Sequence, residues 1–285
     1  MILKTLKRNF SDALSEFYPE SEINSFFGIL AEQFLNMTRA EVALNMYAVI
    51  SSKKNDKFEA ALSRLKTSEP IQYILGETEF YNFNLKVNSS VLIPRPETEE
   101  LVDWIIKDVK KLNQDLNILD VGTGSGCIAI ALANNLPLAK VYGIDVSEEA
   151  IELANENAQL NDVFVDFDKK NILNLEPQKF DIQFNIIVSN PPYVRALEKE
   201  DMLDNVLNFE PHLALFVDNE DPLLFYRHIA KIAINNLAHD GFLYFEINEY
   251  LSKDVMQLLK DYDFKSIELK RDLSGKDRMI KAIKK

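Results

Sequence analysis

The sequence contains little cysteine and histidine and no long apolar run, and each shortage excludes a class of protein. The single cysteine among 285 residues allows no disulfide framework and no cysteine-rich zinc site. The three histidines, His212, His228 and His239, have no metal-ligand spacing, so we expect no metal. No run reaches the roughly 18 apolar residues of a membrane-spanning helix. We therefore expect a cytoplasmic protein without membrane contact.

Basic residues are also scarce. The chain carries 32 Lys and Arg against 45 Asp and Glu, a net charge of −13. Residues 1–75 are balanced at 9 of each sign, so residues 76–285 carry the whole excess, 36 acidic against 23 basic. Non-specific affinity for nucleic acids comes mostly from Lys and Arg that neutralise phosphates. We expect no stable nucleic-acid binding.

The composition is otherwise globular, with 47% hydrophobic residues, and the length suggests about two domains. In residues 1–75 apolar side chains recur at helical spacing, which predicts a small helical bundle. Residues 76–93 alternate between polar and apolar side chains, as in a β-hairpin that links two domains. We expect residues 94–285 to form the second domain.

The second domain shows strands that alternate with helices. Short apolar runs rich in β-formers occupy residues 117–121, 140–145, 184–189 and 241–247. Helical patterns separate them at residues 127–135, 147–160 and 222–237. This alternation predicts a doubly wound α/β fold with a mainly parallel sheet, whose ligands bind at the carboxyl ends of the strands. Residues 266–269 and 278–283 predict a final antiparallel hairpin.

Three of the 8 glycines lie in one loop, directly after the strand at 117–121. Gly122, Gly124 and Gly126 let the backbone turn sharply and approach a ligand closely. Cys127 stands where the dinucleotide-binding fingerprint needs a small residue such as glycine, and the Gly-Lys-Ser/Thr of a P-loop is absent. The G-x-G-x-G pattern resembles that of S-adenosylmethionine-dependent methyltransferases. Because Cys127 opens a helix, a lowered pKa of its thiol is one interpretation, but packing near the cofactor is the favoured one.

A carboxylate follows at the end of the next strand. Asp145 lies 19 residues beyond Gly126, where it can accept hydrogen bonds from both hydroxyls of a ribose. The competing interpretation makes Asp145 the cap of the helix that begins near Ser147. The position at the carboxyl end of a strand favours a cofactor contact.

The sequence Asn190-Pro191-Pro192-Tyr193 ends the strand at 184–189. Two prolines stop the strand and make a rigid corner at the ligand edge of the sheet. The Asn190 amide oxygen and the Pro191 carbonyl are two acceptors for a planar NH2 group, and the Tyr193 ring is a stacking surface. Such a corner suits methylation of an amide or exocyclic amine, whose nitrogen lone pair is otherwise delocalised.

Together these motifs resemble the release factor glutamine methyltransferases, the PrmC/HemK family. The resemblance extends over nearly the whole chain, and the segment Pro94-Arg95-Pro96-Glu97-Thr98-Glu99 separates this family from other Asn-Pro-Pro-Tyr enzymes. It implies a class I, Rossmann-like methyltransferase with a seven-stranded, mainly parallel sheet, a small N-terminal helical docking domain and a β-hairpin linker.

The resemblance also implies a site. Gly122, Thr123, Gly124, Ser125 and Gly126 would hold the methionine part of S-adenosyl-L-methionine, Asp145 the ribose and Ile172 the adenine, with S-adenosyl-L-homocysteine as product. Asn190 would contact both cofactor and substrate, and the glutamine pocket would be formed by Pro191, Pro192 and Tyr193. The implied partner is a class I peptide-chain release factor, bound by a monomer. Two departures stand out: Asn171 replaces a usual acid, and Glu246-Ile247-Asn248 replaces Glu-Ile-Gly.

Two other functions remain open. An amino-methyltransferase that acts on adenine or guanine in nucleic acid uses the same corner, but the net charge disfavours it. A non-catalytic protein that binds S-adenosylmethionine shares the fold, but has no use for a corner with two acceptors.

Overall fold

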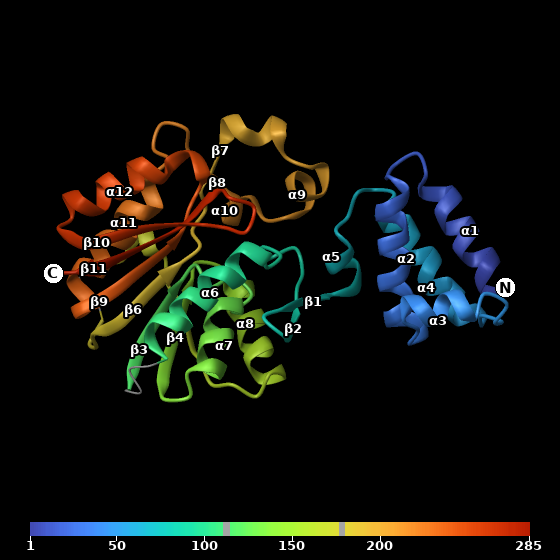
Figure 1. The fold of residues 1–285 in the computed structure, drawn as a ribbon, viewed down its shortest axis with the longest axis horizontal. Helices are drawn as coiled ribbons and strands as arrows, with labels where there is room; N and C mark the ends of the chain where they lie inside the picture. Colours follow the sequence, from blue (N-terminus) through green and yellow to red (C-terminus); the bar gives the residue numbers. More distant parts are fainter. Residues whose placement is uncertain (111–114, 177–179) are drawn as a thin grey trace. The chain divides into compact units, whose positions relative to one another are not determined.

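The computed structural model describes residues 1–110, 115–176 and 180–285, which divide into two compact units. One unit comprises residues 1–75 with 204–209, and the other comprises residues 76–203 with 210–285 (Figure 1). None of the helices formed by these residues is both long enough and apolar enough to cross a lipid bilayer.

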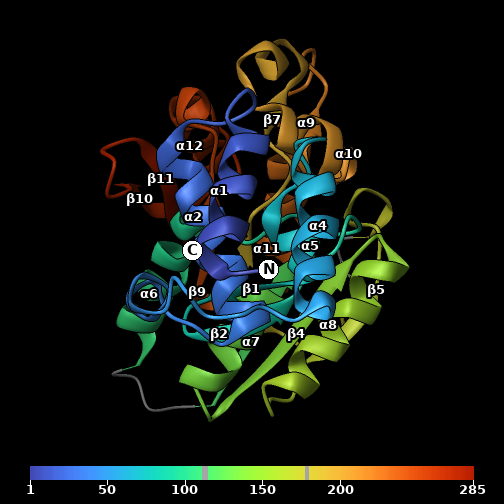
Figure 2. The ribbon, with the colours of Figure 1, turned by 90° about the vertical axis from the view of Figure 1, so that its right-hand side faces the viewer.

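The first unit is a helical bundle. Its core is built around the rings of Phe10, Phe27 and Phe58, whose centroids lie 5.4 to 6.3 Å apart. Thr38 and Glu41 form the capping box that starts α3, where each side chain accepts from the other residue's backbone N–H. Helices α1, α2 and α4 pack against one another (Figures 1 and 2). The helices of this unit are α1 (Leu3–Leu14), α2 (Glu20–Leu35), α3 (Arg39–Leu44), α4 (Ser52–Leu65), α5 (Ile71–Leu75) and α9 (Asp204–Phe209).

The second unit begins with an antiparallel hairpin of β1 (Glu77–Phe80) and β2 (Phe83–Lys86). Its turn residues, Tyr81 and Asn82, both have positive φ, as in the type I′ turn whose twist matches that of the flanking strands. The hairpin is tied to the glycine loop by Asn157, a fully buried residue. The Asn157 amide accepts from the backbone N–H of Lys86 and donates to the carbonyls of Lys86 and Ser125.

A seven-stranded sheet forms the centre of the second unit, with the order β10-β11-β9-β6-β3-β4-β5. The five strands from β9 to β5 in that order are parallel, and β11 and β10 are added antiparallel. The predicted doubly wound, mainly parallel seven-stranded sheet and its terminal hairpin are therefore confirmed. The strands are β3 (Leu116–Val121), β4 (Ala139–Asp145), β5 (Asp166–Lys169), β6 (Phe184–Ser189), β9 (Leu237–Glu246), β10 (Phe264–Arg271) and β11 (Asp277–Lys284).

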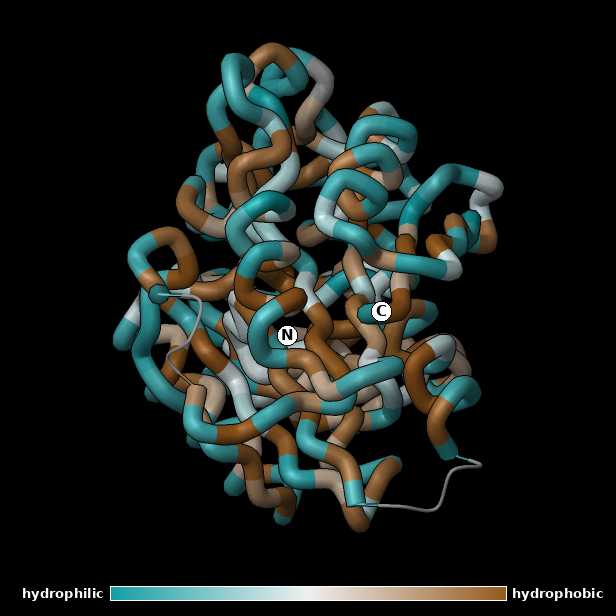
Figure 3. Tube along the Cα trace, turned by 90° about the vertical axis from the view of Figure 1, so that its left-hand side faces the viewer, coloured by the Kyte–Doolittle hydropathy of each residue, from teal (hydrophilic) through white to brown (hydrophobic). Residues whose placement is uncertain are grey.

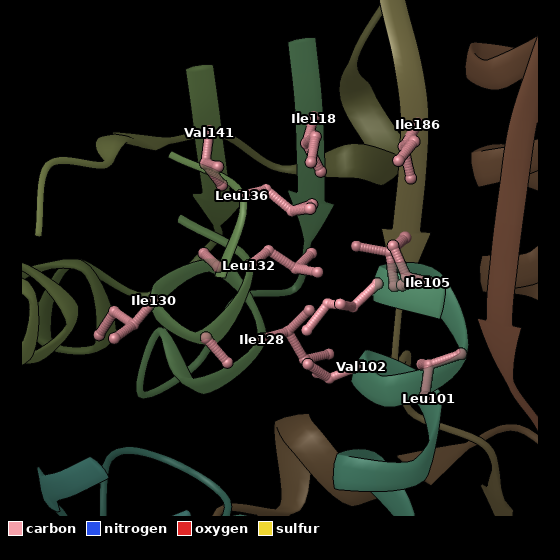
Figure 4. Packing of buried hydrophobic residues seen from close by; sticks show 14 of the residues in the cluster. Leu101, Val102, Ile105, Ile118, Ile128, Ile130, Leu132, Leu136, Val141 and Ile186 are labelled. Carbon is pink, nitrogen blue, oxygen red and sulfur yellow. The ribbon is translucent and has the colours of Figure 1, made fainter. Parts of the chain in front are cut away.

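Helices cover both faces of this sheet (Figure 1). On one face, side chains of α6 and α7 pack against Ile118, Val141 and Ile186 of three neighbouring strands (Figure 4). Hydrophobic and hydrophilic residues alternate along most of the trace (Figure 3). The first face carries α6 (Pro96–Val109), α7 (Cys127–Asn135) and α8 (Glu148–Leu160); the second carries α11 (Leu224–Asn236) and α12 (Ser252–Asp261).

Strands β5 and β9 differ from what the residue pattern predicts, and short elements complete the unit. The edge strand β5 reads Asp-Phe-Asp-Lys, with too few apolar residues to be recognised as a strand. Strand β9 begins at Leu237, four residues before the predicted start, because it follows α11 without a loop. The short elements are η1 (Ile172–Asn174), β7 (Val194–Arg195), η2 (Ala196–Asp201), α10 (His212–Leu215), β8 (Phe216–Val217) and η3 (Glu249–Leu251).

The order of strands also fixes where a ligand can bind. After β3 the chain moves outward through β4 to β5, then returns to the other side of β3 for β6. The carboxyl ends of β3 and β6 are therefore neighbours at a topological switch point, the usual ligand site of such sheets. The glycine loop follows β3 and the Asn190 corner follows β6, so the fold brings the two motifs together.

Candidate active site

A pocket opens at the switch point, within the second unit. Its walls come from four segments: the glycine loop, the end of β4 at Asp145, the corner that begins at Asn190, and the segment from Ser90 to Thr98. Ile172 and Pro211 contribute further apolar wall. Seven of the eight predicted cofactor residues line this pocket, and Gly126 is not among its lining residues; the seven are Gly122, Thr123, Gly124, Ser125, Asp145, Ile172 and Asn190. Among the described residues no group of three or more His, Cys, Asp and Glu side chains is placed to hold a metal ion.

The glycine loop is held in an open, sharply turned form. Gly122, Gly124 and Gly126 have φ values of 73°, 53° and 81°, in the left-handed region that glycine adopts without strain. A Cβ added at Gly122 or Gly124 would meet no atom within 4 Å, so the missing side chains leave space in front of the loop. At Gly126 a Cβ would lie 3.1 Å from the Phe167 ring. The first two glycines thus serve the pocket, and the third allows close packing beneath it.

Asp145 is oriented by two backbone N–H groups. Its Oδ2 accepts from the backbone of Gly124 at 2.9 Å, and its Oδ1 accepts from that of Ser147 at 3.0 Å. The N-cap of α8 is Ser147, whose Oγ accepts from the backbone of Ala150. Asp145 is therefore not the helix cap. Each carboxylate oxygen still has a lone pair that can accept a hydroxyl.

The two residues expected near the adenine play different parts. The side chain of Asn171 accepts from the backbone N–H of Leu173 and so caps the short helix η1. Ile172 is buried and lines the pocket. The departure from an acid at position 171 thus leaves the apolar wall in place.

The corner after β6 is anchored on both sides. Ser189 Oγ donates to the carbonyl of Val121 at 2.7 Å, which joins the ends of β6 and β3. Asn190, Pro191 and Pro192 line the pocket, whereas Tyr193 is not among its lining residues. The Tyr193 ring packs at the edge of the core beneath α11. The structure thus brings three of the four corner residues to the pocket wall, and the predicted stacking role of Tyr193 stays a prediction.

Behind the corner two buried residues form a hydrogen bond that the sequence analysis did not predict. Thr98, in the first turn of α6, and Glu246, at the end of β9, are both buried. Thr98 Oγ1 donates to Glu246 Oε2 at 2.7 Å and accepts from the Asn190 amide at 3.3 Å. Tyr193 donates its hydroxyl to Glu246 Oε1 at 3.0 Å. The sequence offered one indication that Glu246 has a role at the site: it is an acid at the carboxyl end of an apolar strand.

The charge of Glu246 is set by opposing effects. Burial raises its pKa, while the hydrogen bonds from Thr98 and Tyr193 and the positive charge of Arg278 lower it. Burial also raises the pKa of Tyr193 well above its ordinary value, and the negative charge of Glu246 adds to that shift. Tyr193 therefore remains a neutral hydroxyl donor at physiological pH.

The structure favours packing for Cys127 and contradicts the alternative of a lowered pKa. Burial raises the pKa of its thiol to about 12, and the nearby charge of Asp120 acts in the same direction. Loss of solvent around the sulfur therefore outweighs the start of helix α7, because a thiolate is costly in an apolar surrounding. Cys127 is a packing residue beside the pocket.

Asp120 supports the glycine loop from behind. It is fully buried, and its Oδ2 accepts from the Thr123 hydroxyl at 2.6 Å. Burial raises the pKa of Asp120 from 3.8 to about 7, and the charge of Asp145 adds to this, while the Thr123 hydrogen bond opposes it. Between these two pH values the folded protein holds a proton that the unfolded chain has lost. Stability therefore falls as the pH rises through this range.

Replacing Asp120 by asparagine should remove this pH dependence. The Asp120→Asn amide is neutral and still accepts from Thr123, so the variant gains stability relative to the wild type as the pH rises from about 4 to 8. The difference in free energy of unfolding between variant and wild type should change by at most about 4 kcal/mol, because each unit of pKa difference corresponds to roughly 1.4 kcal/mol. Urea unfolding of both proteins across this range measures it. Parallel curves would contradict the raised pKa.

Comparison with known proteins identifies both parts of the chain. A family model described as the PrmC N-terminal domain matches residues 5–76, and one described as a methyltransferase domain matches residues 112–281. A crystal structure of a methyltransferase from Pyrococcus furiosus, 16% identical, covers 82% of this chain and 99% of its own with a TM-score of 0.52. That likeness shows the fold.

Two relatives named release factor glutamine methyltransferase match nearly the whole chain. The protein from Flavobacterium psychrophilum is 51% identical over 283 residues, which is 99% of each chain. The protein from Bacteroides thetaiotaomicron is 41% identical over 271 residues, which is 95% of this chain and 96% of the relative. Since the similarity runs through the helical region, the hairpin and the pocket alike, this chain belongs to the release factor glutamine methyltransferase family.

Proposed function

We propose that the protein transfers the methyl group of S-adenosyl-L-methionine to the side-chain amide nitrogen of the glutamine in the Gly-Gly-Gln motif of class I release factors. The observation that carries this proposal is the meeting of the glycine loop with the Asn190-Pro191 corner in one pocket. Family membership supports the same reaction. Because release factors serve translation, we infer that the protein works in the cytoplasm.

The pocket fits the cofactor by the chemistry of its walls. The space in front of Gly122 and Gly124 would take the methionine part, with Thr123, Ser125 and Gly126 completing the loop. Asp145 would accept from the ribose hydroxyls, and Ile172 would lie against the adenine. When bound, the cofactor supplies an electrophilic methyl group.

The corner would activate the substrate nitrogen. The lone pair of a glutamine amide is delocalised into its carbonyl, which makes the nitrogen a poor nucleophile. Asn190 Oδ1 and the Pro191 carbonyl oxygen would each accept one N–H of the amide, and Pro192 would form the adjoining wall. Holding both hydrogens to one side favours a pyramidal nitrogen whose lone pair faces the methyl group. The bond from nitrogen to the methyl carbon would form in line as the bond from the sulfonium sulfur to that carbon breaks, which would leave S-adenosyl-L-homocysteine, and one amide proton would pass to solvent.

The charge distribution favours a protein substrate. Residues 76–285 carry 36 acidic and 23 basic side chains, so their field repels a nucleic acid. Adenine or guanine in nucleic acid is the alternative substrate, since each has an exocyclic NH2 group. A methyl-transfer experiment distinguishes the protein substrate from the nucleic-acid substrate.

Methyl transfer from labelled S-adenosyl-L-methionine is the decisive measurement. We expect label on a purified class I release factor, and none on its Gln→Asn variant in the Gly-Gly-Gln motif or on duplex DNA. The Asn190→Ala enzyme should transfer at least about 100-fold more slowly, because one of the two acceptors is lost. Label on DNA would establish the alternative, and cofactor binding without any transfer would indicate a non-catalytic protein.

The role of Asp145 is tested by cofactor affinity. In Asp145→Asn the amide can no longer accept at both positions, so an N–H of Gly124 or Ser147 loses its partner and the ribose loses an acceptor. We expect the Kd for S-adenosyl-L-methionine to rise about 10-fold or more by calorimetry. Asp166→Asn, the same charge change on the exposed edge strand β5, is the matched control. Equal Kd values for both variants would exclude Asp145 from the cofactor site.

We further propose that residues 1–75 form a docking domain for the release factor, residues 76–93 a linker and residues 94–285 the methyltransferase domain. The first unit has a complete core of its own. It nevertheless exposes apolar side chains within six residues at and after the end of α3: Leu44, Tyr47 and Val49 are 84%, 76% and 81% exposed. Their exposure and the balanced charge of residues 1–75 suit a protein surface more than a nucleic acid.

The double variant Leu44→Ser/Val49→Ser tests the docking surface. Both side chains lie outside the core, so folding and cofactor affinity should be kept, while KM for the release factor rises about 10-fold or more at unchanged kcat. Phe164→Ser is the control, because Phe164 is 86% exposed in the second unit. An unchanged KM in the double variant, or the same rise in the control, would refute this surface.

A further inference from the structure

Four side chains in and behind the pocket wall form one continuous hydrogen-bonded chain. It runs from the Asn190 amide to the Thr98 hydroxyl, from there to Glu246, and from Glu246 to the Tyr193 hydroxyl. Thr98 and Glu246 are 2% and 1% exposed, so solvent does not compete for these bonds. The two residues are 148 positions apart and come from α6 and β9.

The direction of each proton in this chain follows from the donors available. Both oxygens of Glu246 accept in the structure, one from the Tyr193 hydroxyl and the other from the single hydroxyl proton of Thr98. The Thr98 oxygen then has only lone pairs to offer, and its other partner must be a donor. Asn190 therefore turns its NH2 group toward Thr98, and its oxygen points the opposite way.

That direction matters for the proposed chemistry. An amide NH2 group and an amide oxygen have nearly the same shape, so packing alone discriminates poorly between the two orientations of Asn190. With the amide reversed, an NH2 group would face the NH2 group of the substrate, and the corner would lose one acceptor. The bond from Thr98 to Glu246 disfavours this arrangement, because it leaves Thr98 no proton to donate to the Asn190 oxygen.

Glu246 also accepts from Tyr193 through its other oxygen, at 3.0 Å. Each oxygen of one carboxylate thus holds a different end of the Asn190-to-Tyr193 corner. Asn248 adds to this support, since its amide donates to the Tyr193 carbonyl at 3.1 Å and to Glu198. The corner is held by side chains from β9 and the residues just after it, as well as by its own prolines.

We propose that Thr98 and Glu246 are positioning residues, which orient the Asn190 amide so that its oxygen, and not its NH2 group, meets the amide of the substrate. The inference rests on the proposed glutamine methyl transfer. It assigns a function to the threonine of the Pro94-to-Glu99 segment and to the acid that ends β9.

The test compares kcat for methyl transfer at saturating cofactor among Thr98 variants. Thr98→Val keeps the shape and removes the hydroxyl, so kcat should fall between about 10- and 100-fold with a smaller change in KM. Thr98→Ser keeps the hydroxyl and should stay within about threefold of the wild type. If Thr98→Val is unfolded by circular dichroism, Thr98→Ala replaces it, since it removes the same hydroxyl and adds no methyl group.

A double variant separates positioning from a general structural effect. If Thr98 acts through Asn190, Thr98→Val should cause no further loss of kcat in an Asn190→Ala enzyme. The matched control is Tyr244→Phe, which removes another hydroxyl–carboxylate bond between β9 and α6, from Tyr244 to Asp108 at 2.7 Å. This control should retain wild-type kcat.

The outcomes distinguish the inference from the proposed function. A wild-type enzyme that does not methylate the release factor refutes the proposed function. If the wild type is active, three results would refute the positioning role alone. These are a kcat of Thr98→Val equal to that of the wild type, a kcat of Thr98→Ser as low as that of Thr98→Val, and a double variant whose loss of kcat is the product of the Thr98→Val and Asn190→Ala losses. A loss in Tyr244→Phe equal to that in Thr98→Val likewise overturns it, because weaker α6–β9 packing then accounts for both.

Discussion

The parallel pairing of β3 with β6 is the constraint on which the rest of the site depends. It sets Val121 beside Ser189, and the Ser189 hydroxyl binds the Val121 carbonyl. The loop that follows one strand and the corner that follows the other therefore leave the sheet at adjacent points. A shift of this register by one residue would turn the side chains of a strand to the opposite face and separate the two halves of the pocket.

Both halves of the pocket are supported in the same way. Behind the glycine loop the buried Asp120 accepts from Thr123, and behind the corner the buried Glu246 accepts from Thr98. A buried carboxylate costs free energy, which is why burial raises the pKa of each. Because each carboxylate accepts the hydroxyl proton of its threonine, the direction in which that hydroxyl points is fixed. The two buried carboxylates thus lower the stability of the fold, and they hold the pocket wall in one geometry.

The departures from the family pattern lie outside the chemistry of the corner. Asn171 caps η1, while Ile172 still lines the pocket. Asn248 stands where glycine is usual, and its amide bonds to the Tyr193 carbonyl and Glu198. A glycine at position 248 lacks these donors, so this chain supports its corner with side-chain contacts that the usual pattern does not contain.

Local pattern alone determined the alternation of strands and helices, the glycine loop and the proline corner, because these depend on neighbouring residues and on backbone freedom. It missed β5, whose edge position needs few apolar residues, and it left the direction of the Cys127 pKa shift open, because that pKa depends on burial by distant parts of the chain. Only the tertiary structure decided that Thr98 meets Glu246 across 148 residues and that Tyr193 turns its hydroxyl to that acid. Such contacts arise when a helix packs on a sheet, and a buried hydrogen bond requires both partners to lose their water together.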